Sequence, residues 1–200
     1  MRPLATLPLL LALLLAVPAS AQTEFLLKGG LNTAFFSGAD ANGLDPRLGV
    51  VAGAGVRLAV APQLGIQLEA LYSQEGAVED DGSGRYELDY LDLPVLLRAD
   101  LPAGLNRLGV YAGPQVGIPL RSVFKPDIGP AEDEQARTDV GLALGADFGA
   151  GPISIDARYV LGLNDALDDE IAGEPVTPLS LRNQTVSFTL VYTFGGGRRY

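Results

Sequence analysis

The chain has 200 residues, the length of one ordinary domain, and carries 24 acidic against 14 basic side chains, a net charge of −10. Such an acidic chain repels nucleic acid, which excludes DNA and RNA as expected partners. The sequence contains no histidine and no cysteine. This excludes disulfides, His/Cys metal sites and hydrolases that place a histidine base beside a nucleophile. We therefore expect no enzyme activity, no metal site and no cofactor.

The first 21 residues have the pattern of a secretory signal peptide. Arg2 supplies a positive charge, residues 4–17 are apolar apart from Thr6, and residues 19–21 read Ala-Ser-Ala, a small-residue cleavage site. The alternative is a retained membrane helix, but the apolar run is shorter than the roughly 20 residues that such a helix needs. We predict a signal peptide over residues 1–21 and a single mature domain over residues 22–200.

Eight segments of the mature chain alternate between apolar and polar or small residues, the period of a β-strand with two different faces. In chain order they are Glu24–Ser37, Arg47–Ala61, Gln63–Glu75, Arg85–Leu101, Leu105–Leu120, Arg137–Ala150, Pro152–Leu163 and Asn183–Phe194.

The links between these segments alternate in length. Short links fall at Ala61-Pro62, Pro102–Gly104 and Gly149–Pro152; longer ones fall at Gly38–Pro46, Gly76–Gly84, Arg121–Ala136 and Gly162–Arg182. Short turns at one end and long loops at the other predict an all-β fold. We expect an eight-stranded antiparallel up-and-down transmembrane β-barrel with short periplasmic turns and long outer loops.

The faces of the segments sort by polarity. In the last segment the apolar row consists of Val186, Phe188, Leu190, Tyr192 and Phe194. In the fourth segment an apolar row runs from Leu91 to Leu101, eleven residues. A tilted transmembrane strand needs about 9–11 residues, so these rows predict strands whose apolar face meets lipid.

A soluble lipocalin-like barrel is the alternative, because its strands also alternate but turn their apolar row inward. A row that faces water usually carries many lysines and glutamates. Here the polar rows are mostly glycine, alanine, serine and glutamine, and Lys28 is the only lysine in any of the eight segments. Small residues suit a crowded lumen, which favours the membrane barrel.

Aromatic residues of the apolar rows fall at two heights. Near the short turns lie Phe25, Phe148, Tyr192 and Phe194; near the long loops lie Phe35, Tyr72 and Tyr159. Aromatic rings favour the level of the lipid headgroups. We interpret the two groups as the aromatic girdles of an outer-membrane barrel.

Seven charged residues fall on the rows that would face the lumen. The arginines are Arg57, Arg98 and Arg158, and the acids are Glu69, Asp92, Asp147 and Asp156. One interpretation is an acid pair that carries out hydrolysis. The other is a salt-bridge network that fills the lumen, which is favoured because an isolated buried charge is costly. Neighbouring strands lie about 4.8 Å apart, so we expect each arginine to reach one of the four acids.

Four motifs resemble the PorT-like outer-membrane β-barrel domain family. They are Tyr90-Leu91-Asp92-Leu93-Pro94-Val95-Leu96-Leu97-Arg98, Tyr111-Ala112-Gly113-Pro114-Gln115-Val116-Gly117, Asp139-Val140-Gly141-Leu142 and Ala157-Arg158-Tyr159-Val160-Leu161-Gly162-Leu163. The first motif is moderately specific and the glycine-rich ones are weak alone. The resemblance covers nearly the whole mature chain and implies that residues 22–200 form one outer-membrane β-barrel domain.

Two further groups of acids lie in predicted outer loops: Glu79-Asp80-Asp81 in one, and Asp165, Asp168, Asp169, Glu170 and Glu174 in the other. They lack the spacing of a calcium-binding EF-hand loop, which favours a solvated acidic surface over a cation site.

These observations favour a structural or interaction barrel of the outer membrane, with acidic external loops and a lumen filled by side chains. A narrow pore, or a component of an envelope transport or secretion assembly, is the alternative within the membrane. The expected partners are outer-membrane lipid and other envelope proteins, and the oligomeric state is left open.

Overall fold

In the computed structural model, the described residues are 23–37, 44–79, 84–126, 132–133, 138–165, 170–171, 174–175 and 182–195. The long strands are β1 Thr23–Ser37, β2 Leu44–Ala61, β3 Leu64–Glu79, β4 Gly84–Ala103, β5 Asn106–Pro126, β7 Asp139–Ala150, β8 Ile153–Asp165 and β11 Arg182–Phe194. The short ones are β6 Glu132–Asp133, β9 Glu170–Ile171 and β10 Glu174–Pro175. No helix among the described residues is long and apolar enough to cross a membrane.

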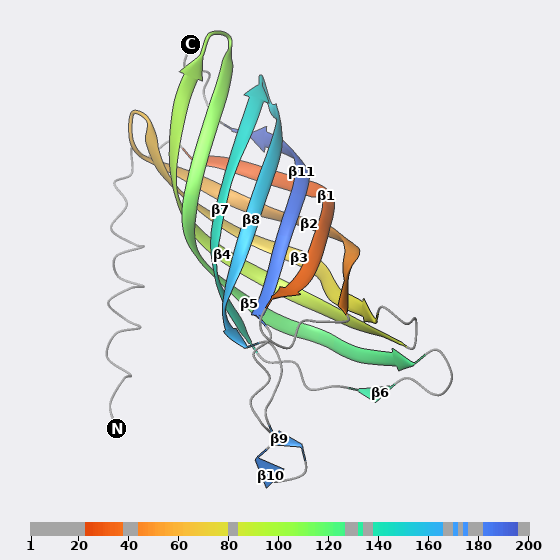
Figure 1. Ribbon diagram of the computed structural model, residues 1–200. Coiled ribbons are helices and arrows are strands. Elements are labelled where there is room, and N and C mark those ends of the chain that lie inside the picture. Colours follow the sequence, from red (N-terminus) through yellow and green to blue (C-terminus); the bar gives the residue numbers. More distant parts are fainter. Residues whose placement is uncertain are drawn as a thin grey trace, which may run out of the picture.

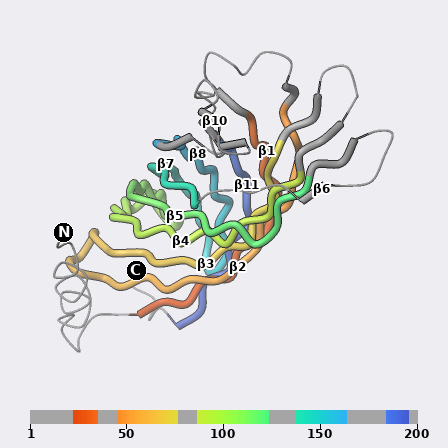
Figure 2. The backbone as a smooth tube through the Cα atoms, turned by 90° about the horizontal axis from the view of Figure 1, so that it is seen from below, coloured from red at the N-terminus to blue at the C-terminus, as the bar shows by residue number. Residues whose placement is uncertain are grey.

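The eight long strands form one closed antiparallel sheet. Their order is β4-β3-β2-β1-β11-β8-β7-β5, and a further pairing between β4 and β5 closes the ring. Figure 1 shows the red first strand beside the blue last strand, and Figure 2 shows the same two neighbours from below. At this seam Phe25 lies opposite Phe194, and Phe35 lies opposite Gln184. The predicted eight-stranded up-and-down barrel is confirmed.

Three tight turns lie at one end of the barrel. Each has two residues between the paired strands: 62–63, 104–105 and 151–152. Gly104 and Gly151 have φ angles of 67° and 62°, a left-handed conformation that glycine adopts at little cost. These turns are the short turns that the link lengths predict, and their placement in the periplasm stays a prediction.

At the other end the strands run further than predicted. β3 continues to Glu79 rather than Glu75, and β5 continues to Pro126 rather than Leu120. Strict alternation is needed only where one face of a strand meets lipid, whereas backbone pairing can continue beyond that point. The predicted long links Gly76–Gly84 and Arg121–Ala136 therefore begin too early in the chain.

The apolar rows face outward. Leu97, Ile155 and Phe188 are 62%, 63% and 61% exposed, respectively. The row that faces the interior contains buried polar and charged residues such as Asn32 and Gln67. This arrangement is the inverse of a soluble barrel, which would bury its apolar row.

Lumen-facing glycines allow neighbouring strands to approach closely. A Cβ added at Gly113 would lie 2.0 Å from the backbone oxygen of Val95 and 2.9 Å from the Cα of Leu96, whereas a Cβ at Gly29 would meet nothing within 4 Å. We expect Gly113→Ala to destabilise the barrel by about 1–3 kcal/mol, because the neighbouring backbone would have to move. Gly29→Ala is the matched control and is expected to be nearly neutral. The measurement is urea-induced unfolding in lipid vesicles, followed by circular dichroism because the chain has no tryptophan.

Candidate functional site

The centre of the lumen holds four charged side chains from three strands, here called the central cluster: Lys28 of β1, Glu69 of β3, and Asp156 and Arg158 of β8. Lys28 Nζ lies 3.2 Å from Glu69 Oε1 and 2.9 Å from Asp156 Oδ1. Arg158 Nη2 lies 2.7 Å from Glu69 Oε2. All four side chains are at most 3% exposed, so the two cations and two acids balance one another away from water.

Tyr111 of β5 completes the central cluster. Its hydroxyl donates to Asp156 Oδ2 at 2.6 Å and accepts from Arg158 Nε at 3.2 Å. Its ring lies within cation–π distance of two cations, with Arg158 Cζ 5.1 Å and Lys28 Nζ 5.9 Å from the centroid. Thr189 of β11 donates to the other Asp156 oxygen at 3.1 Å. The cluster therefore joins strands from opposite parts of the sheet.

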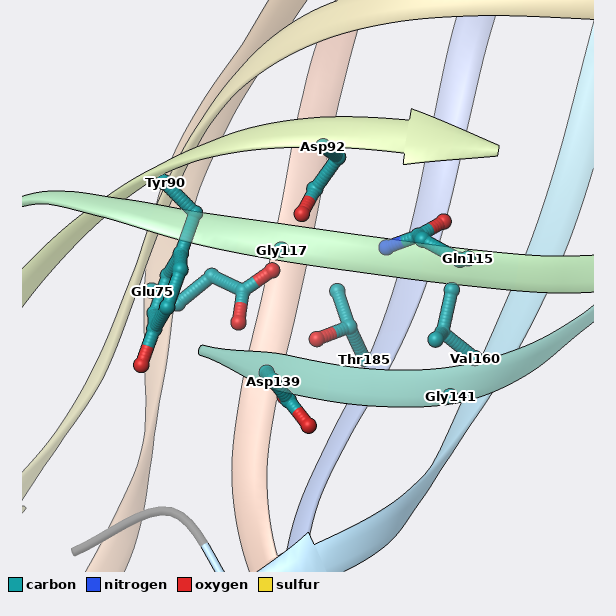
Figure 3. Close-up of a pocket in the computed structure, with 9 residues that line it drawn as sticks. All are labelled: Glu75, Tyr90, Asp92, Gln115, Gly117, Asp139, Gly141, Val160 and Thr185. Atoms are coloured by element: carbon teal, nitrogen blue, oxygen red, sulfur yellow. The ribbon is translucent and has the colours of Figure 1, made fainter. Parts of the chain in front are cut away.

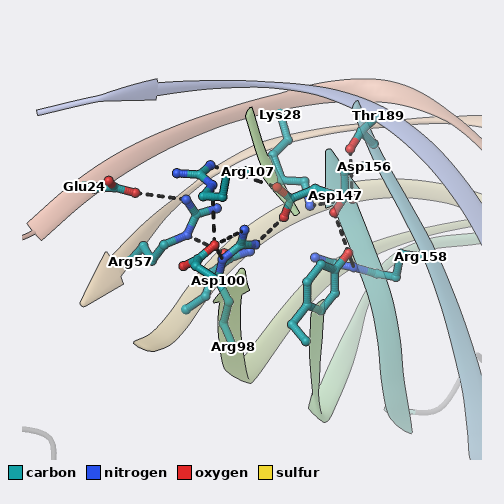
Figure 4. A network of polar contacts seen from close by, with 12 residues as sticks. Glu24, Lys28, Arg57, Arg98, Asp100, Arg107, Asp147, Asp156, Arg158 and Thr189 are labelled. Carbon is teal, nitrogen blue, oxygen red and sulfur yellow. Dashed lines mark hydrogen bonds and ion pairs between the residues drawn. The ribbon is translucent and has the colours of Figure 1, made fainter. Parts of the chain in front are cut away.

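A second layer lies nearer the tight turns and contains six charged residues, here called the mouth cluster: Glu24, Arg57, Arg98, Asp100, Arg107 and Asp147 (Figure 4). Arg98 is its buried centre. Its Nη1 donates to Asp147, and its Nε and Nη2 donate to Asp100 Oδ1 at 2.9 and 2.6 Å. Arg107 approaches the same two acids less closely, at 3.4 Å from Asp100 and 4.0 Å from Asp147.

The structure brings most of the predicted lumen charges together, but Arg57 differs from the expectation. Its Nη1 pairs with Glu24 at 2.9 Å, and its Nε donates to Gln67 at 3.0 Å. The expectation that Arg57 reaches one of the four predicted acids is wrong because of strand register. Arg57 lies directly opposite Glu24 on β1 and Gln67 on β3, whereas Glu69 lies opposite Gly55.

Asp92 also stands apart from the predicted network. It lies opposite Leu71 on β3 and Gly117 on β5, so neither neighbour offers a cation. No ion pair joins it to a basic side chain in the part of the chain that the structure describes. Together with Gln115 it lines a cavity of about 10 Å³ (Figure 3). The expectation of a salt bridge at Asp92 is therefore wrong.

The sequence interpretation missed Lys28, Tyr111, Glu24, Asp100 and Arg107 as members of the two clusters. For Lys28 a signal was present: it shares the parity of Leu26 and Asn32, which are also buried. Asp100 and Arg107 flank a tight turn, and charged residues beside a turn are usually expected to face solvent. They belong to the mouth cluster because an eight-stranded barrel is narrow enough for side chains to meet across its mouth.

The predicted girdle residues lie on the outer face. Near the tight turns, Phe25, Phe148, Tyr192 and Phe194 are exposed, and the rings of Tyr192 and Phe194 meet edge to face at 4.6 Å. Near the opposite end, Tyr72 is exposed, whereas Phe35 and Tyr159 are half-buried. The Tyr159 hydroxyl donates to Gln184. Contact of these rings with lipid headgroups stays a prediction.

The acidic loop residues Asp80, Asp81, Asp168 and Asp169 lie outside the described residues, as do the signal-peptide residues 1–21. Within the described ranges, no group of three or more acidic side chains is arranged to hold a metal ion.

Residues 20–168 match the family model described as outer membrane protein beta-barrel domain. The chain belongs to this family. The protein is thus an outer-membrane β-barrel protein, and the lipid of that membrane surrounds its apolar outer face. The soluble lipocalin-like alternative is not supported, because both the family and the outward apolar rows contradict it.

Several solved barrels are similar to this chain at low sequence identity. Neisserial surface protein A is 12% identical with a TM-score of 0.50, over 84% of this chain and 96% of that chain. The attachment invasion locus protein Ail of Yersinia pestis is 17% identical with a TM-score of 0.48, over 86% and 99%. OprG of Pseudomonas aeruginosa is 15% identical with a TM-score of 0.43, over 88% and 98%. No curated protein is significantly similar in sequence.

Proposed function

We propose that the protein is a non-enzymatic barrel with a structural or interaction role in the outer membrane, and that its lumen is closed by the central cluster. One observation carries this proposal: Lys28, Glu69, Asp156 and Arg158 cross the lumen as a connected set of ion pairs with almost no exposure. A barrel of eight strands is just wide enough for such side chains to fill it. The outer loops then present the surface on which partners act.

The hydrogen bonds of the two central acids favour a plug over a hydrolytic acid pair. Glu69 accepts from Lys28 and Gln67 on one oxygen and from Arg158 on the other. Asp156 accepts from Lys28 and Thr189 on one oxygen and from Tyr111 on the other. A general acid or base must be able to exchange a proton with a substrate, and these carboxylates are engaged on both oxygens.

The proposal is tested by conductance in planar lipid bilayers. We expect the purified protein to show no steady open state. In the paired variant Arg158→Ser with Glu69→Ser, one cation and one acid leave together, and Lys28 still balances Asp156. This variant should show a raised ion conductance because its lumen contains two smaller side chains. Conductance equal to that of the native protein would show that other residues close the lumen.

A narrow pore is the second candidate, and one observation favours it. A cavity of about 660 Å³ lies at the tight-turn end and reaches the mouth cluster. A steady, ion-selective open state of the native protein would establish this candidate and overturn the plug. A role within an envelope transport or secretion assembly would then become the leading hypothesis.

Two finer assignments belong to the same proposal. The motif from Tyr90 to Arg98 supports placement among PorT-like members of the family. The pattern of residues 1–21 supports removal of a signal peptide and a single barrel domain over residues 22–200. The intact mass of the protein purified from outer membranes checks this cleavage, and a chain that still begins at Met1 would contradict it.

A further inference from the structure

The cavity at the tight-turn end is bounded by all three turns. Its lining includes Pro62, Gly104 and Pro152 from these turns, and Thr193 and Gly195 from the end of β11. Its volume is about 660 Å³, enough for a small organic solute. Because these turns are expected to lie in the periplasm, a ligand would enter from that side.

Four charged residues of the mouth cluster line this cavity: Glu24, Arg57, Asp100 and Arg107. The side chains of Glu24, Asp100 and Arg107 are 23%, 28% and 30% exposed, respectively, whereas Arg98 beneath them is fully buried. Figure 4 shows Arg57, Arg98 and Arg107 gathered around Asp100. The groups that a ligand can contact are therefore the outer members of the cluster.

Within the mouth cluster, Arg98 makes hydrogen bonds to the acids, whereas Arg107 approaches them only at longer distances. Asp100 Oδ1 accepts two bonds from Arg98, and Asp147 Oδ2 accepts another. Arg107 shares these two acids only at ion-pair distance, 3.4 and 4.0 Å. Its Nε, the atom that lies 3.4 Å from Asp100 Oδ1, is buried and makes no hydrogen bond among the described residues. A guanidinium carries five N–H donors, and because the Arg107 side chain is 30% exposed, its Nη donors are the ones available to a ligand at the cavity wall.

We infer that Arg107, with Arg57 beside it, makes this cavity a binding site for a small solute that bears a carboxylate group. A carboxylate offers two oxygens in the plane of a guanidinium fork, the geometry that a donor-rich arginine recognises best. Glu24 does not block the site, because Arg57 already holds it at 2.9 Å. The site would operate in addition to the proposed structural role.

Charge balance favours a carboxylate over a phosphate. The mouth cluster contains three arginines and three acids, so it is neutral before a ligand arrives. A carboxylate adds one negative charge to this layer, whereas a phosphate adds close to two. Because the cluster is already neutral, no cation is left over for an anion, and the two charges of a phosphate are therefore disfavoured more strongly than the single charge of a carboxylate.

The test uses the mature protein in lipid nanodiscs with ¹⁵N-labelled arginine, and follows the Nε–Hε signals by NMR. Propionate, which carries a single negative charge at neutral pH, is the probe; propionamide is the neutral analogue, propylamine the cationic analogue and inorganic phosphate the competing anion. We expect a saturable shift of the Arg107 signal with propionate and none with propionamide or propylamine. Phosphate is expected to bind at least tenfold more weakly. Loss of one signal in Arg107→Lys assigns the resonance.

Arg107→Gln is expected to lower the affinity for propionate by about tenfold or more, read from the Arg57 signal, which Arg57→Lys assigns in the same way. Arg121→Gln is the matched control, because Arg121 lies at the other end of the same strand with a half-exposed side chain. An unchanged far-ultraviolet circular dichroism spectrum confirms that each variant is folded. The inference is overturned by the absence of a saturable shift, by an equal response to propionamide or phosphate, or by unchanged affinity in Arg107→Gln.

Discussion

Arg158→Ala is expected to lower the free energy of unfolding of the barrel by about 3–5 kcal/mol. The substitution removes the cation that holds Glu69 at 2.7 Å and the donor that reaches the Tyr111 hydroxyl. Lys28, which is already shared with Asp156, would be the only cation left beside Glu69, so the centre of the lumen would carry one uncompensated negative charge. An unpaired charge in a dry site costs far more than a lost surface ion pair. Urea-induced unfolding in lipid vesicles, followed by circular dichroism, measures the difference.

The control for this experiment is Arg121→Ala. Arg121 Nη1 lies 3.6 Å from Glu87 Oε2, and the arginine side chain is 52% exposed. A pair of this kind is worth about 0–1 kcal/mol because water can replace it. A double variant, Arg158→Met with Glu69→Gln, should recover part of the loss because it removes both charges. If Arg158→Ala and Arg121→Ala cost the same, the central cluster is hydrated and does not close the lumen.

The fold could be predicted from alternation because lipid imposes a strong constraint on sequence. A strand that crosses the membrane cannot place a charge on its outer row, so the row from Leu91 to Leu101 contains none. The lumen row does not meet lipid, so it can carry charges, and it contains Arg98 and Asp92. Parity along each strand therefore identifies the two faces without any knowledge of which strands are neighbours.

The ion pairs could not be predicted from parity alone, because pairing across strands depends on register. Arg57 and Glu69 occupy the correct face, yet a shift of two residues in register places Arg57 opposite Gln67 instead. Asp147 and Arg98 meet across the intervening β5, at a position where Gly109 has no side chain between them. Such contacts depend on the size of a third residue, which no pairwise pattern in the sequence reveals.

The positions at which the strands end were also difficult to predict from the sequence. Outside the hydrocarbon a strand needs no apolar row, so β5 continues to Pro126 although the predicted segment ends at Leu120. The mouth cluster was missed for the same reason, because it also lies near strand ends, at the tight-turn end of the barrel. Asp100 and Arg107 flank a tight turn, and their side chains turn inward over the lumen rather than outward to water.

Leu97→Arg is expected to destabilise the barrel by about 2–4 kcal/mol, whereas Leu101→Arg should cost about 0–1 kcal/mol. Both leucines belong to the outer row of β4 and are 62% and 44% exposed, respectively. Leu97 lies near the middle of the crossing, opposite Ile66 and Ala112, so an arginine there would place its charge in hydrocarbon. Leu101 lies two residues before the end of β4, where a long side chain can reach the headgroups.

The difference in cost between Leu97→Arg and Leu101→Arg, two positions on one strand, distinguishes a membrane barrel from a water-soluble one. In water both positions are exposed on the outer face, and an arginine would cost little at either. In lipid the cost depends on depth, because the energy of a charge rises toward the middle of the bilayer. Unfolding in vesicles gives the two free energies, and the same variants in detergent micelles should differ less because micelles deform around a charge. Equal costs at the two positions in vesicles would contradict the placement of the outer row of β4 across the membrane.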